Sequence, residues 1–148
     1  MRRAKVIGPV FVLLLLGGLV LPTPAASAAT SPKTVKVLLS EWLVQARPKT
    51  VSAGRVRFVV RNAGSEEHEF MIMRADGSSM MSTKSDGSLD EDMMHGDIVG
   101  HIMGIDSKQT KSKTFRLEAG KYMLVCNLVD DMGDVHYAKG MHNTLRVT

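Results

Sequence analysis

The sequence of 148 residues contains one cysteine, Cys126, and therefore no pair that could form an internal disulfide. A single thiol in a secreted chain is buried and inert, pairs with another chain, or binds a metal. Because a free thiol is a liability in an oxidising compartment, secretion would favour the metal.

Most of the chain also lacks an excess of positive charge. The formal net charge is +4, but Arg2, Arg3 and Lys5 supply three of these charges, so residues 29–148 carry about +1. This balance argues against a nucleic-acid binder, which needs a basic patch.

The N-terminus has the pattern of a secretory signal peptide. A basic start precedes the apolar residues 6–21, and Ala26-Ser27-Ala28 offers a cleavage site. We expect a signal peptide at 1–28, a mature domain at 29–148 and a periplasmic or otherwise secreted protein. The alternative is an uncleaved N-terminal anchor, and only that alternative would place the protein at a membrane.

The remaining sequence shows strand patterns and no convincing helix. In residues 55–61, Val56, Phe58 and Val60 share one face, whereas the arginines share the other. Similar short segments, separated by turn residues, predict an all-β, Greek-key antiparallel β-sandwich. These segments are 34–44, 55–61, 67–74, 113–118, 121–126 and 143–148.

Residues 75–110 interrupt this pattern and are expected to form a long inserted loop, with a short helical turn at 89–94. The segment is rich in methionine and histidine, which could bind Cu(I) transiently or pack over the sandwich. These residues are Met80, Met81, Met93, Met94, Met103, His95 and His101.

The C-terminal part of the chain places Cys126, His136 and Met141 close together in sequence. Thiolate, imidazole and thioether suit copper, and a second histidine would complete a His₂Cys site with a weak axial methionine. His68 is the candidate, because it shares strand parity with Phe70 and Ile72 and so points to the core side. Taken singly, each of these residues also has an ordinary structural explanation, as a packed core residue or a loop residue.

Two blocks of sequence resemble the cupredoxins, the blue copper family. The first, VSAGRVRFVVRNAGSEEHEF, is similar to the strand, turn and first histidine ligand of that family. The second is AGKYMLVC followed by HYAKGM, and the final NTLRVT also fits. The resemblance implies His68, Cys126, His136 and Met141 as metal ligands for one Cu(I)/Cu(II) ion. His142 and Met132 remain alternatives.

The sequence departs from the family pattern between the cysteine and the second histidine. Nine residues, NLVDDMGDV, separate Cys126 from His136, where typical members have only a few. We expect this extension to project as its own hairpin, turned by Met132-Gly133-Asp134.

The resemblance implies a type 1 (blue) copper protein that transfers electrons between redox partners, docking near His136. We expect no enzymatic activity and a monomer. The alternative is a periplasmic or extracellular copper carrier or resistance protein that captures copper with the Met/His-rich segment. A structural module without metal is a further possibility.

Overall fold

The computed structural model describes residues 31–75, 81–94 and 96–148. The expected cleavage site, Met80 and His95 lie outside these residues. The described chain contains nine strands. They are β1 (Lys33–Ser40), β2 (Leu43–Arg47), β3 (Thr50–Val51), β4 (Gly54–Asn62), β5 (His68–Arg74), β6 (Ile98–Ile105), β7 (Thr110–Leu117), β8 (Gly120–Val125) and β9 (His142–Val147).

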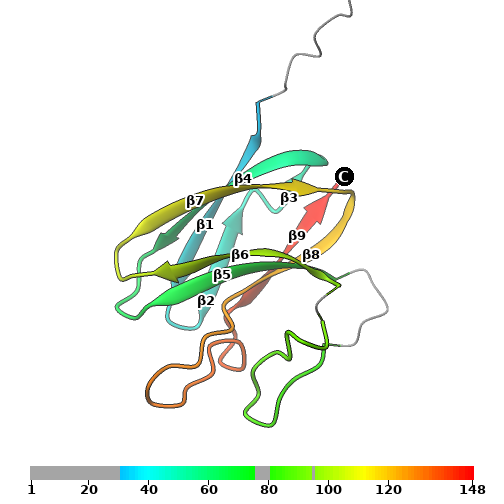
Figure 1. Cartoon of the computed structure of the whole chain (residues 1–148). Helices are drawn as coiled ribbons and strands as arrows, with labels where there is room; N and C mark the ends of the chain where they lie inside the picture. Colours follow the sequence, from blue (N-terminus) through cyan, green and yellow to red (C-terminus); the bar gives the residue numbers. More distant parts are fainter. Residues whose placement is uncertain (1–30, 76–80, 95) are drawn as a thin grey trace, which may run out of the picture.

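The strands form two sheets that pack face to face (Figure 1). One sheet has the order β2-β1-β4-β7 and the other has the order β3-β9-β8-β5-β6. The expected β-sandwich is therefore confirmed. In the described part of the chain no helix is long and apolar enough to cross a membrane.

The sheets are mixed, which the antiparallel prediction did not include. β1 pairs parallel with β4, and β3 pairs parallel with β9, whereas the other pairs are antiparallel. The reason is the path of the chain: after β2 it crosses to the other sheet as β3 and returns on the far side of β1. A hairpin connection would have forced antiparallel pairing there.

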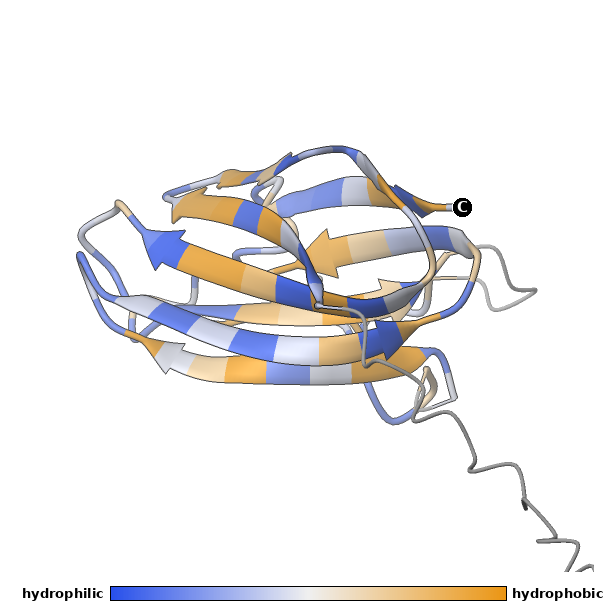
Figure 2. Ribbon diagram, turned by 90° about the horizontal axis from the view of Figure 1, so that it is seen from above, coloured by the Kyte–Doolittle hydropathy of each residue, from blue (hydrophilic) through white to orange (hydrophobic). Residues whose placement is uncertain are grey.

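The core lies between the sheets and follows the alternation of each strand. Val56, Phe58 and Val60 of β4 are fully buried, and Phe58 packs on Phe70 of β5 with ring centroids 5.3 Å apart. Figure 2 shows the resulting alternation of apolar and polar positions along the strands. Burying each such side chain contributes about 1.5–3 kcal/mol.

Two parts of the chain differ from the sequence-based expectation. Residues 34–44 are not one strand, because the chain turns between β1 and β2 and Trp42 there has a φ of 63°. The segment 75–110 is not wholly loop, since it contains β6, which pairs with β5. Gly100 and Gly104 interrupt the side-chain alternation of β6, and the sequence therefore lacks the pattern that would have predicted this strand.

Part of the Met-rich segment packs on the outer face of the five-stranded sheet. Met71 and Met73 of β5 form a small apolar cluster there with Leu89 and Met94. The Met94 N–H donates to Asp90 O at 3.2 Å, which gives the single helical turn expected there. The packing interpretation therefore holds for Met94 and for Met81, which lies against the same cluster, whereas Met93 and Met103 are 73% and 59% exposed.

Candidate metal centre

The structure brings His68, Cys126 and His136 together at one end of the sandwich. Their Nδ1, Sγ and Nδ1 atoms face one another. The two Nδ1 atoms are 3.1 Å apart, and Cys126 Sγ lies 3.9 Å from His68 Nδ1 and 3.4 Å from His136 Nδ1. Atoms bound to one ion at about 2.0–2.3 Å have separations of this size. All three residues are buried.

The position of Cys126 follows from β8. The residue continues the inward face of Tyr122 and Leu124, and it comes directly after the strand ends. The backbone N–H of Glu69 donates to its Sγ at 3.4 Å. Burial nevertheless raises the pKa of the Cys126 thiol to about 11. The thiol is therefore neutral near pH 7 without metal, and a bound ion would have to displace its proton.

The turn before β5 fixes His68. Asn62 is buried and its Nδ2 donates to Ile105 O and Glu66 O, while its Oδ1 accepts from the Gly64 N–H. Glu41 accepts hydrogen bonds from the backbone N–H groups of Ser65 and Glu66. Burial, and secondarily the neighbouring His136, lower the pKa of His68 to about 4, so its neutral ring suits metal binding.

The extension between Cys126 and His136 forms its own hairpin, as expected. Val129 bridges Val135, and the Gly133 N–H donates to Asp130 O across a turn in which Gly133 has a φ of 84°. The His136 N–H then donates to Leu128 O at 2.9 Å, which closes the hairpin. The orange loop at the open end of the sandwich in Figure 1 is this segment.

Met141 is fully buried beside the two other C-terminal residues of the site. Its N–H donates to His136 O, and its carbonyl accepts from the Cys126 N–H, both at 3.0 Å. The alternatives lie outside the cluster: Met132 is 90% exposed, and the exposed His142 ring packs on Tyr137. Of the candidates for the axial position, Met141 is thus the methionine held next to the donors.

The second histidine is covered, which the sequence did not indicate. His136 is only 1% exposed. The Trp42 ring meets it edge-on with centroids 5.5 Å apart, and Glu66 Oε2 lies 3.5 Å from its Nε2. A partner that docks near this end would touch Trp42, which is 37% exposed, rather than His136.

A polar network connects the cysteine to the segment that covers the sheet. The Asn127 N–H donates to Glu69 Oε1, and burial raises the pKa of that carboxyl. The Asn127 side chain also bonds both the N–H and the carbonyl of Leu89, at 2.7 and 3.1 Å. The sequence offered the backbone N–H of Glu69 or of Asn127 as a donor to the sulfur without deciding between them; the structure has Glu69 as that donor, while the Asn127 N–H bonds the Glu69 carboxylate. The contacts of Asn127, Glu66 and Trp42 are long-range and left no local signal.

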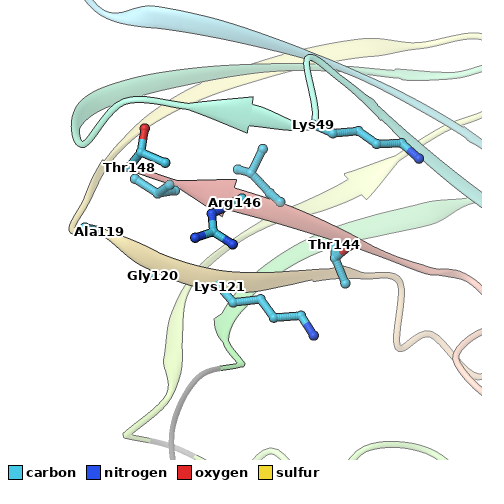
Figure 3. Close-up of a pocket in the computed structure, with 9 residues that line it drawn as sticks. Lys49, Ala119, Gly120, Lys121, Thr144, Arg146 and Thr148 are labelled. Carbon is cyan, nitrogen blue, oxygen red and sulfur yellow. The ribbon is translucent and has the colours of Figure 1, made fainter.

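A surface hollow of about 640 Å³ lies at the end of the five-stranded sheet that is opposite the His-Cys-His cluster. Figure 3 shows Lys49, Lys121 and Arg146 around it. The register pairs Gly120 with Val147 at that end and Val125 with His142 at the metal-site end. This hollow is therefore separate from the metal centre.

The chain is similar to known proteins in structure but not in sequence. The sequence matches no protein-family model and no curated protein at a significant level. Among solved structures, reduced auracyanin of the photosynthetic bacterium Roseiflexus castenholzii has a TM-score of 0.58 at 18% identity, covering 80% of this chain and 98% of its own. Reduced rusticyanin has a TM-score of 0.51 at 21% identity, with coverages of 80% and 81%.

Auracyanin A of Chloroflexus aurantiacus, described as a "blue" copper protein, has a TM-score of 0.52 at 17% identity, with coverages of 80% and 100%. These similarities are structural rather than sequential. They show that the chain has the β-sandwich fold of the cupredoxins, and the His-Cys-His cluster with Met141 lies at one end of that fold.

Proposed function

We propose that this protein is a mononuclear blue copper protein that transfers single electrons. The observation that carries the proposal is the convergence of His68 Nδ1, Cys126 Sγ and His136 Nδ1 within one buried cluster. Soft thiolate favours Cu(I), and imidazole readily binds Cu(II), so one rigid site can serve both oxidation states. Copper, when bound, supplies the redox change.

The residues around the cluster support this role by holding the donors in place. Hydrogen bonds fix the turn before His68, and the Glu69 N–H already points at the sulfur. Met141 is held next to both His136 and Cys126 by backbone hydrogen bonds and would be the weak axial ligand. A site that is fixed before the metal binds needs little rearrangement when the ion changes charge.

The remaining parts of the proposal concern partners and location. We propose exchange with redox proteins at the end that carries Trp42, because this partly exposed ring lies against His136. We also propose that the protein is not an enzyme, acts as a monomer and works in the periplasm or outside the cell after removal of residues 1–28. The signal-peptide pattern in the sequence supports this location.

The carrier hypothesis receives less support. It requires the methionines of segment 75–110 to be available for copper, but Met94 is only 2% exposed and packs under the loop, as Met81 does in part. Met93 and Met103 are exposed. Of the four described methionines of this segment, Met81 and Met94 thus pack against the sheet, and only Met93 and Met103 remain open to solvent.

A titration with Cu(II), followed by visible absorption and EPR spectroscopy, tests the proposal. We expect one equivalent to give an intense thiolate-to-copper charge-transfer band and a narrow copper hyperfine splitting. Cys126→Ser should abolish the band, because it removes the sulfur. Weak colour or thiol oxidation in the unaltered protein would contradict the proposal, and uptake of several equivalents without the charge-transfer band would favour the carrier hypothesis.

A further inference from the structure

The outer side of the His136 ring faces a second set of donors. Glu66, Asp130 and His136 each offer one ligand atom, and these atoms lie within 4.8 Å of one another. His136 uses Nε2 here, whereas its Nδ1 belongs to the copper cluster. We infer that Glu66, Asp130 and His136 Nε2 form a second cation site, for a divalent transition ion such as Zn²⁺, linked to the copper through the His136 imidazole.

The first observation behind this inference is a pair of buried polar atoms. His136 is 1% exposed, and within the described residues its Nε2 has no hydrogen-bond partner, nor does Glu66 Oε2. The two atoms face each other at 3.5 Å. That distance is long for a hydrogen bond but suits two ligands of one tetrahedral ion, which lie about 3.4 Å apart when each is about 2.1 Å from the metal. An ion between them would satisfy both atoms.

The second observation is the local build of the hairpin. Asp130 Oδ1 accepts the backbone N–H groups of Met132 and Asp134, at 2.9 and 2.8 Å. These two hydrogen bonds fix the Asp130 side chain through one of its two carboxylate oxygens. The extension in the sequence thus presents a held carboxylate beside the outer nitrogen of His136.

The third observation is access. A hollow of about 430 Å³ borders all three residues and is also lined by Glu67, Asp131 and Met132. An ion could enter through it, and water could supply a fourth ligand. The additional carboxylates would attract a cation rather than an anion. Imidazole with two carboxylates suits Zn²⁺ or Cu²⁺ better than Ca²⁺ or Mg²⁺, which favour oxygen ligands alone.

The binding step balances with the loss of one proton. If copper occupied Nδ1, a neutral His136 ring would hold its proton on Nε2. Binding of the second ion at Nε2 would release that proton to solvent, and the resulting imidazolate would serve both sites. The negative charges of Glu66 and Asp130 offset the charge of the added ion.

The test uses copper-loaded protein, in which the first site is already filled. The added ions do not displace this copper, because Cu²⁺ binds more tightly than they do. Co²⁺ is then titrated while the Cu(II) EPR signal is recorded. We expect one equivalent of Co²⁺ to remove the signal, because an imidazolate bridge couples the two spins, and excess Zn²⁺ to restore it. A copper signal that Co²⁺ leaves unchanged would overturn the inference.

Two matched variants locate the site. Asp130→Asn keeps the Oδ1 acceptor that holds the hairpin but removes the charge, and Zn²⁺ affinity measured by calorimetry should fall at least about tenfold. Asp131→Asn makes the same change one residue along the same loop and should alter the affinity less than about twofold. Equal losses in both variants would show diffuse attraction by the acidic loop and would overturn the site, as would an unchanged affinity in Asp130→Asn.

The charge-transfer band recorded before Co²⁺ is added separates this inference from the proposed function. If copper gives no such band, the blue copper proposal fails. The second site is then tested by titrating Zn²⁺ into Cys126→Ser protein with and without Asp130→Asn. An equal affinity in these two proteins would overturn the second site independently.

Discussion

At the scale of single residues, Trp42 connects the His-Cys-His cluster to the surface of the protein. Its φ of 63° is unusual for a bulky side chain, and its ring meets the His136 ring edge-on. The Lys139 ammonium lies 4.8 Å from the centroid of the same ring. Since His136 is buried, the indole is the partly exposed group through which a partner would reach the proposed copper ligand.

Trp42→Leu should slow electron exchange with a redox partner by about tenfold or more, because it removes a large aromatic contact at the docking surface. The charge-transfer band should persist, since no donor is changed. Stopped-flow kinetics and absorption spectra measure the two effects. Leu43→Ala removes a neighbouring exposed apolar side chain and serves as the control; an equal loss of rate there would argue against a specific role for Trp42.

Met141 should influence the reduction potential and the spectrum of the copper without being required for copper binding. Met141→Leu fills nearly the same buried volume, so the fold should survive at a cost below about 1.5 kcal/mol. Copper should remain bound through the other donors, while the reduction potential and the visible spectrum should both change. Cyclic voltammetry and absorption spectroscopy test this, and an unaltered potential with an unaltered spectrum would remove Met141 from the ligand set.

At the scale of elements, the site depends on three loops at one end of the sandwich. The turn between β1 and β2 supplies Glu41 and Trp42, the turn after β4 leads to His68, and the segment 126–141 carries the other donors. Glu41 joins the first two loops, because its carboxylate accepts the Ser65 and Glu66 N–H groups. Gly64 leaves the space for this carboxylate, where any Cβ would collide with it.

Glu41→Gln should weaken this junction in a pH-dependent way. Hydrogen bonds from its own N–H and from Glu66 and Ser65 lower the pKa of Glu41 from 4.5 to about 2. A lowered pKa stabilises the fold above pH 4.5, and this contribution disappears as the pH falls from 4.5 towards 2. The variant should therefore lose on the order of 1 kcal/mol at pH 7 and match the original protein near pH 2.

Urea unfolding of both proteins across this pH range measures the difference. Glu67→Gln, a charge-matched change at an exposed position in the next turn, is the control. A constant difference between Glu41→Gln and the original protein at all pH values would contradict the assigned cause.

The sequence predicted the parts of these elements that depend on local pattern. Strand parity placed His68 and Cys126 on the core side, and Met132-Gly133-Asp134 marked the turn of the hairpin. It did not predict β6, whose glycines hide the alternation, or the parallel pairs, which depend on the path between sheets. The contacts of Trp42 and Glu66 with His136 span the chain and have no local pattern to reveal them.

At the scale of the whole molecule, the metal site closes the end of a sandwich that is otherwise held by its apolar core. His68 begins β5, Cys126 directly follows β8 and His136 lies in the loop before β9, so a bound ion would connect these three parts of the chain. An ion that binds the folded chain more tightly than the unfolded chain adds its binding free energy to stability.

Copper loading should therefore raise the unfolding temperature. At free copper 100-fold above the dissociation constant, the gain is about 2.7 kcal/mol, which corresponds to roughly 10 °C in a domain of this size. Differential scanning calorimetry of metal-free and copper-loaded protein measures it. In Cys126→Ser, which lacks the thiolate, most of the copper-dependent rise should vanish while the metal-free unfolding temperature changes little. A rise of the same size in that variant would mean that copper stabilises the fold from another site.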